Sequence, residues 1–220
     1  MRSVLISAGL GLIISILTTP LAIRAFRRQG LGQEIRDDGP ESHLSKKGTP
    51  TMGGTVIVGA TVGGYLGAHL FLVDTPGRGV TATGGLLLFL MVGMGVVGFL
   101  DDYLKIRHRR SLGLNKTAKL VGQLVVGVAF AVLAINFPSG NGITPASTTV
   151  SYVRDIAPLA LGAVGFVVLA YVFIAGFSNA VNLTDGLDGL AAGSSAMVLV
   201  SYVFISFWQF THDCATEVIA

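Results

Sequence analysis

The stretch VTATGGLLLFLMVGMGVVGFLDDYLK, residues 80–105, decides the fold class of this 220-residue chain. Its first 21 residues carry no charge, and two adjacent aspartates, Asp101 and Asp102, follow directly. A membrane-spanning helix needs about 20 mostly apolar residues. The stretch therefore predicts a transmembrane helix that leads into a pair of carboxylates.

The composition excludes a soluble, a disordered or a fibrous protein. Hydrophobic residues make up 51% of the chain and charged residues 12%, whereas an ordinary soluble domain has about a quarter of its residues charged. So few charges cannot cover the surface of a soluble protein of this size. The single cysteine excludes an internal disulfide bond, and the sequence has no cysteine–histidine pattern with the spacing of a zinc site.

Six stretches have the length and apolarity of a membrane-spanning helix. They are residues 3–23, 53–73, 80–100, 120–137, 157–177 and 189–210. The basic residues after the first stretch are typical of a retained helix rather than of a cleaved signal peptide. We therefore predict an all-α polytopic membrane protein with a single integral-membrane domain, residues 1–220, and a solvated connector at 138–155.

The distribution of basic residues predicts how the helices are oriented. Of the 15 Lys and Arg residues, 12 lie in segments 24–52 and 101–119, and the remaining three are Arg2, Arg78 and Arg154. Basic loops stay in the cytoplasm. The pattern predicts an N-terminus outside the cell, with both basic segments and the segment 178–188 in the cytoplasm.

Asp101 and Asp102 are unusual residues for the cytoplasmic end of a transmembrane helix. The helix dipole there disfavours each negative charge by about 0.3–1 kcal/mol, and acids at the membrane edge are commonly functional. Neutralisation by Lys105 or Arg107 is the alternative explanation. Adjacent helical side chains point about 100° apart, which predicts different roles for the two aspartates.

The other clusters of polar residues are also predicted to be cytoplasmic: HLSKKGTPTMGG (43–54), NKTAK (115–119) and NAVNLTDGLDGL (179–190). In segment 179–190, Asn182, Asp185 and Asp188 lie among glycines. These residues either cap the sixth helix or line a phosphate site at its N-terminus. The lysines of the first two either contact anionic lipids or bind substrate. Carboxylates beside lysines suit Mg²⁺-dependent chemistry on phosphates, so we predict phosphoryl transfer involving a lipid phosphate.

In order and spacing, these motifs resemble those of the phospho-N-acetylmuramoyl-pentapeptide-transferases, over residues 1–210. The resemblance implies a bacterial cell-membrane enzyme of peptidoglycan synthesis. Such an enzyme transfers phospho-MurNAc-pentapeptide from UDP-MurNAc-pentapeptide to undecaprenyl phosphate, yields lipid I and UMP, and requires Mg²⁺. The implied partners are both substrates and the lipid bilayer; a homodimer is left open, and no nucleic acid is involved.

The resemblance also implies roles for individual residues. Asp101 and Asp102 correspond to the catalytic aspartate pair of the family. The implied substrate-binding residues are Lys46, Thr51, Lys119, Asn182, Asp185 and Asp188. Of these, Asp185 and Asp188 are also implied to lie near the metal.

Members of this family have ten spans, whereas six are predicted here. The resemblance therefore implies an N-terminal portion, which we expect to insert into membranes but not to catalyse transfer by itself. Three alternatives remain: a polyprenyl-phosphate GlcNAc-1-phosphate transferase, a non-catalytic membrane protein that keeps only the fold, and a transporter or channel. A transporter would carry charges at mid-membrane depth, whereas the acids here are predicted at helix ends.

Overall fold

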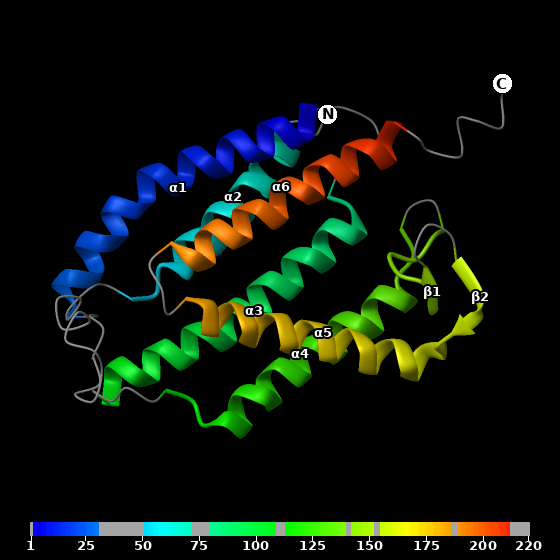
Figure 1. Cartoon of the computed structure of the whole chain (residues 1–220). Coiled ribbons are helices and arrows are strands. Elements are labelled where there is room, and N and C mark those ends of the chain that lie inside the picture. Colours follow the sequence, from blue (N-terminus) through cyan, green and yellow to red (C-terminus); the bar gives the residue numbers. More distant parts are fainter. Residues whose placement is uncertain are drawn as a thin grey trace. The chain divides into compact units, whose positions relative to one another are not determined.

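A computed structural model describes residues 2–30, 51–71, 80–108, 113–139, 142–151, 155–185 and 189–211. In this part of the chain the elements are, in order, α1 (Arg2–Arg28), α2 (Gly54–Phe71), α3 (Ala82–His108), α4 (Lys116–Asn136), β1 (Thr149–Ser151), β2 (Asp155–Ala160), α5 (Gly162–Thr184) and α6 (Leu190–Thr211) (Figure 1). The chain forms two compact units, Met1–Val172 and Phe173–Ala220. The single integral-membrane domain stays a prediction.

The helices confirm the predicted all-α polytopic membrane protein. Five of the described helices, α1, α3, α4, α5 and α6, are long and apolar enough to cross a membrane. Helix α2 has 18 residues, which at 1.5 Å per residue gives a length of about 27 Å. This length lies at the lower end of the range for spanning helices.

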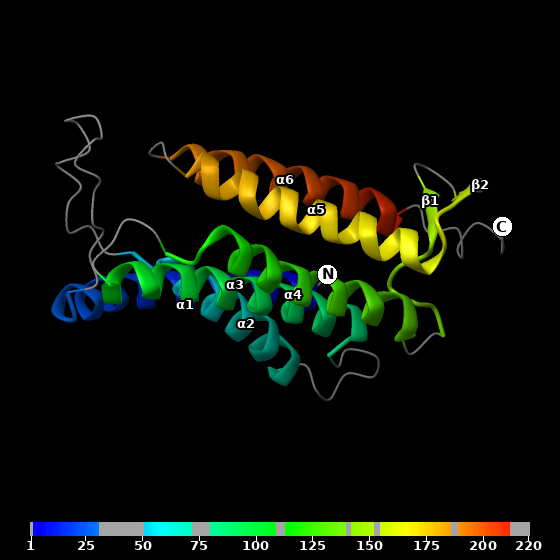
Figure 2. The same ribbon diagram turned by 90° about the horizontal axis from the view of Figure 1, so that it is seen from below.

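Small residues bring α1 and α2 into close contact, and the two helices lie side by side (Figures 1 and 2). A Cβ atom added to Gly64 would lie 2.7 Å from the backbone nitrogen of Gly11 and 2.7 Å from the carbonyl oxygen of Ser7. Helices in lipid gain little from the hydrophobic effect, so close backbone approach through small residues is a main source of their attraction. Gly64 is therefore a position where packing requires glycine.

The Gly64→Ala substitution should destabilise the pair α1–α2 by about 1–3 kcal/mol, because the new methyl group overlaps backbone atoms that cannot rotate away. Gly59→Ala on the same helix is the matched control, since a Cβ atom there meets nothing within 4 Å. The thermal unfolding midpoint of the detergent-solubilised protein measures both effects. Equal midpoints for the two variants would contradict the packing described here.

Helices α3 and α4 pack side by side and antiparallel (Figures 1 and 2). A Cβ atom on Gly93 would lie 2.7 Å from Val126 Cγ1, and one on Gly122 would lie 3.1 Å from Val97 Cγ2. The two contacts lie four residues, about one turn, apart on each helix. One further turn along each helix leads from Val97 to Asp101 on α3 and from Gly122 to the first turn of α4, which begins at Lys116. Asp101 therefore lies opposite that turn.

The chain between α4 and α5 differs from the prediction. The predicted connector 138–155 contains strand β1, which pairs antiparallel with β2, Thr149 opposite Ala160. The predicted start of the fifth span at residue 157 is therefore wrong, because 157–160 belong to β2 and the helix begins at Gly162. Gly162 has φ +65°, a conformation that glycine adopts at little cost and that separates the strand from the helix.

Candidate functional site

The aspartate pair lies inside α3 and not at its end. The predicted span ended at Leu100, but the helix continues to His108 and carries Lys105, Arg107 and His108 in its last turn. Basic residues are favourable at a helix C-terminus because they complement its dipole. Both aspartates are therefore held in regular helical geometry, close to a basic helix end.

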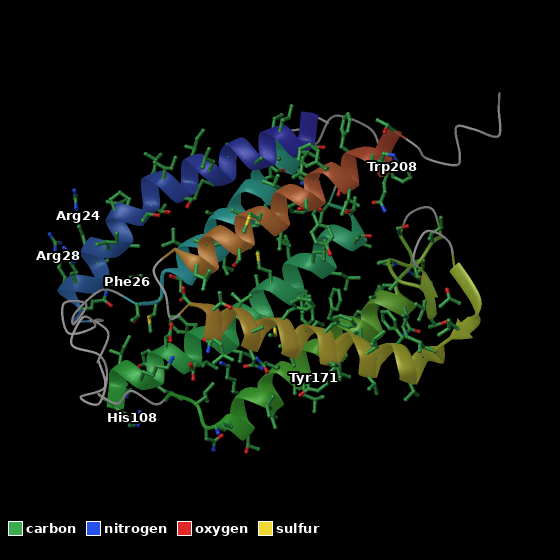
Figure 3. All side chains as sticks on the ribbon, in the orientation of Figure 1. Arg24, Phe26, Arg28, His108, Tyr171 and Trp208 are labelled. Carbon is green, nitrogen blue, oxygen red and sulfur yellow. The ribbon has the colours of Figure 1, made fainter. Side chains whose placement is uncertain are left out.

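This basic end of α3 lies at the same end of the first unit as the basic end of α1. Figure 3 shows His108, in the last turn of α3, at the end where Arg24 and Arg28 project from α1. The location of the segments after α1 and after α3 on one side of the membrane stays a prediction.

Lys105 joins the two carboxylates of the pair. Its Nζ lies 2.7 Å from Asp101 Oδ2 and 2.9 Å from Asp102 Oδ1. Residues three and four apart are neighbours on a helix surface, so the DDYLK spacing produces the contact. The sequence predicts Lys105 as a neutralising partner of the pair, and its i+3 and i+4 spacing explains why it bridges both carboxylates. Two carboxylates and one ammonium leave one negative charge in excess.

Asp101 also contacts the backbone just before α4. The backbone N–H of Leu114 donates to Asp101 Oδ1 at 2.8 Å. Gly113 lies against Asp101 so closely that a Cβ atom there would collide with the carbonyl oxygen and the carboxylate of Asp101. Asp101 is only 8% exposed, and both of its carboxylate oxygens have partners within the protein.

The first turn of α4 carries the predicted substrate-binding residue Lys119. Asn115 caps this helix, and its Oδ1 accepts from the N–H of Ala118 at 2.6 Å. The N–H of Lys119 donates to the carbonyl of Asn115 at 3.0 Å, which starts the regular helix. Lys119 is half-buried and lies in the turn that α3–α4 packing places opposite Asp101.

Thr51 lies three residues before Gly54, the first residue of α2, in the same unit. Its hydroxyl oxygen is buried and has no hydrogen-bond partner among the described residues. The next residue, Met52, is buried and has φ 70°, a conformation that is uncommon for a residue other than glycine. A buried polar group without a partner costs about 1–3 kcal/mol, and the substrate-binding role of Thr51 stays a prediction. Lys46 lies outside the described residues.

In the second unit, the described site residues Asn182 and Asp185 lie at the end of α5 and not at the start of α6. Asn182 is an exposed residue in the last turn of α5, and Thr184 Oγ1 donates to the carbonyl of Ala180 at 2.8 Å. Asp185 is exposed in the following turn, and its N–H donates to the carbonyl of Val181 at 3.1 Å. These residues therefore do not cap the sixth helix, which was one of the two predicted explanations.

The position before α6 belongs to Gly189, whose carbonyl accepts from the N–H of Gly193 at 2.8 Å. Asp188 lies outside the described residues, so its implied position near the metal, together with Asp185, stays a prediction. Within the described ranges, no group of three or more His, Cys, Asp or Glu side chains has the arrangement of a metal site.

The regions that carry these residues match models of known protein families. A model of glycosyl transferase family 4 matches residues 85–220, more than half of the chain, and covers the aspartate pair, Lys119 and the segment 179–190. Signature 1 of the phospho-N-acetylmuramoyl-pentapeptide-transferases matches residues 46–58, which include Lys46 and Thr51.

Relatives named phospho-N-acetylmuramoyl-pentapeptide-transferase match almost the whole chain. The protein of Saccharopolyspora erythraea is 58% identical over 215 residues, which are 98% of this chain and 59% of the relative. Those of Frankia alni and Mycobacterium leprae are 59% and 54% identical, over 97% and 98% of this chain and 59% and 60% of the relatives. The chain thus spans about three fifths of the length of these relatives, and it belongs to glycosyl transferase family 4, with phospho-N-acetylmuramoyl-pentapeptide-transferases as its relatives.

Proposed function

We propose that the protein transfers phospho-MurNAc-pentapeptide from UDP-MurNAc-pentapeptide to undecaprenyl phosphate, giving lipid I and UMP in peptidoglycan synthesis. The names of its relatives support this activity. The observation that carries the proposal is the cluster of Asp101, Asp102 and Lys105 at the basic end of α3, inside the region that matches the family model. A carboxylate pair in that position suits a reaction between two phosphates at a membrane surface.

The proposed reaction exchanges one pyrophosphate linkage for another. An oxygen of the lipid phosphate attacks the phosphorus that is bound to the sugar, and the bond from that phosphorus to the UMP oxygen breaks. Both reactants are anions, so the site must offset their charge and hold them in line. Lys119, half-buried at the start of α4, and Lys46 are the cations that we assign to this task.

The residues present fit a magnesium ion that is shared with substrate phosphates. Mg²⁺ is usually bound through one or two carboxylates plus phosphate oxygens and water. Asp102 would hold it, because its side chain is 36% exposed and only its Oδ1 contacts Lys105 among the described residues. The excess negative charge of the cluster also favours a bound cation. When bound, Mg²⁺ neutralises charge that develops on the phosphates.

We assign the remaining predicted residues to substrate contacts. Thr51 offers its unpartnered hydroxyl, and Asn182, Asp185 and Asp188 contact the nucleotide sugar, with Asp185 and Asp188 close to the metal. The N-terminus lies outside the cell and the site faces the cytoplasm, where UDP-sugars are available. An active homodimer stays a prediction.

The direct test measures UMP release. The protein is expressed from the whole open reading frame that contains this chain, and is supplied with UDP-MurNAc-pentapeptide, undecaprenyl phosphate and Mg²⁺. We expect UMP release that depends on the lipid and that disappears in the double variant Asp101→Asn/Asp102→Asn. UDP-GlcNAc should neither replace the muramoyl substrate nor compete with it. Turnover of UDP-GlcNAc alone would identify the related GlcNAc-1-phosphate transferase activity instead.

A further inference from the structure

We propose that one exposed face of α1 binds anionic phospholipids, with its arginines on the phosphate headgroup and its apolar side chains along the acyl chains. This face, the α1 lipid face, comprises Ile13, Leu17, Leu21, Arg24 and Arg28. The inference concerns the bilayer around the protein and not the reaction, so it stands independently of the proposed function.

The charged end of the α1 lipid face has no acidic partner. Arg24, Arg27 and Arg28 lie in the last five residues of α1, a helix without Asp or Glu. Arg24 and Arg28 are four residues apart and hence neighbours on the helix surface, and both project from the end of α1 (Figure 3). All three arginines are exposed, and among the described residues none of them has an ion-pair partner. Their guanidinium groups are therefore available to an external anion.

Apolar side chains continue the line of these arginines along α1. Ile13, Leu17 and Leu21 follow one another at intervals of four residues, and Leu21 precedes the first arginine by three. These spacings place side chains on one side of a helix. The exposed fractions of the three apolar residues are 54%, 63% and 60%. Helix α2 packs instead against Gly11 and Ile14, so it leaves the apolar line uncovered.

The dimensions of the α1 lipid face match one phospholipid in one leaflet. The apolar line from Ile13 to Leu21 extends over about 12 Å of helix, and one leaflet contains about 15 Å of hydrocarbon. The arginines that follow Leu21 then lie at the depth of the headgroups, where a guanidinium can donate two parallel N–H bonds to phosphate oxygens. A soluble anion would use the arginines but not the apolar line. An anionic phospholipid uses both, which is why we assign it to this face.

The test measures which lipid lies beside α1 by quenching of tryptophan fluorescence. The protein is made from the whole open reading frame, with every native tryptophan, Trp208 included, replaced by phenylalanine and with Leu17→Trp as the reporter. It is reconstituted in mixed bilayers of phosphatidylglycerol and phosphatidylcholine, in which one or the other lipid carries brominated acyl chains. The quenching gives the association constant of the anionic lipid relative to that of the zwitterionic lipid. Ile13→Trp is a second reporter on the same face, for use if Leu17→Trp does not fold.

We expect Leu17→Trp to report a preference of about fivefold or more for phosphatidylglycerol, since a single basic residue near an anionic membrane surface contributes about that factor. Arg24→Gln/Arg28→Gln should remove the preference. Arg24→Lys/Arg28→Lys should retain part of it, because the charge remains while the paired geometry of the guanidinium is lost. The matched control is Arg107→Gln/Lys116→Gln, which removes two positive charges from the ends of α3 and α4 and should keep the full preference.

Equal association of the two lipids at the reporter would overturn the inference, and so would a preference that survives Arg24→Gln/Arg28→Gln. An equal loss of preference in the matched control would show that net charge, and not this face, attracts the lipid. No quenching by either lipid at both reporter positions would show that another segment of protein covers the face. UMP release takes no part in the measurement, so a failure of the proposed function would leave the result unchanged.

Discussion

Replacement of Asp102 by asparagine should lower the rate of UMP release by about 10²–10³-fold, the usual effect of removing one group that offsets charge at the reacting atoms, because the substitution removes the carboxylate that we propose holds Mg²⁺. The substitution keeps the size of the side chain but removes its charge and half of its acceptor capacity. Because Asp102 is 36% exposed and contacts only Lys105 in the described residues, the fold should tolerate the change. Steady-state UMP release from the whole open reading frame measures the effect.

Tyr103→Phe is the control for this prediction. Tyr103 is the next residue on α3 and stacks on Phe99, with ring centroids 6.0 Å apart, so phenylalanine keeps the contact. This variant should retain the wild-type rate, and both variants should elute as the wild type does in size-exclusion chromatography. Wild-type turnover by Asp102→Asn would return the pair to a purely structural role, as charges neutralised by Lys105.

Labelling from outside the cell should distinguish cysteines introduced into the two basic segments, which we expect to stay unlabelled, from the native Cys214, which we expect to react. Ser45 and Ser111 lie in the two basic segments that the distribution of Lys and Arg assigns to the cytoplasm. In a Cys214→Ser background, Ser45→Cys and Ser111→Cys should therefore resist an impermeant maleimide in intact cells and react once the membrane is opened.

The native Cys214 provides the opposite result in the same experiment. It follows α6, which ends at Thr211, and an even number of crossings from an outside N-terminus places it outside. Intact cells that carry the native sequence should therefore be labelled. Labelling of Ser45→Cys and Ser111→Cys from outside, with no labelling of Cys214, would invert the proposed topology and place the site on the outer face.

The boundaries of the helices show where sequence reasoning reached its limit. The sequence predicts a helix over the whole apolar run 157–177, but its first residues belong to strand β2, which pairs with Thr149–Ser151. A short apolar run does not distinguish a strand from a buried helix by periodicity. Pairing with β1 decided between them, and that pairing is a contact between separate segments.

The aspartate pair shows the same limit within the site. Helical spacing alone predicts that Lys105 is close to both Asp101 and Asp102, and the structure has both ion pairs. No spacing relates Asp101 to Leu114, which is 13 residues away. That contact exists only because α3 and α4 pack antiparallel through Gly93 and Gly122.

The sequence by itself determined that the chain is a helical membrane protein, and it predicts that the basic segments lie on one side of the membrane. Those properties depend on apolar length and on charge, which are local quantities and need no knowledge of neighbouring helices. The tertiary structure alone decided that Asp101 is buried against Gly113 and Leu114 while Asp102 stays accessible. Two adjacent aspartates are chemically identical in the sequence, and only the helix packed against one of them makes them different.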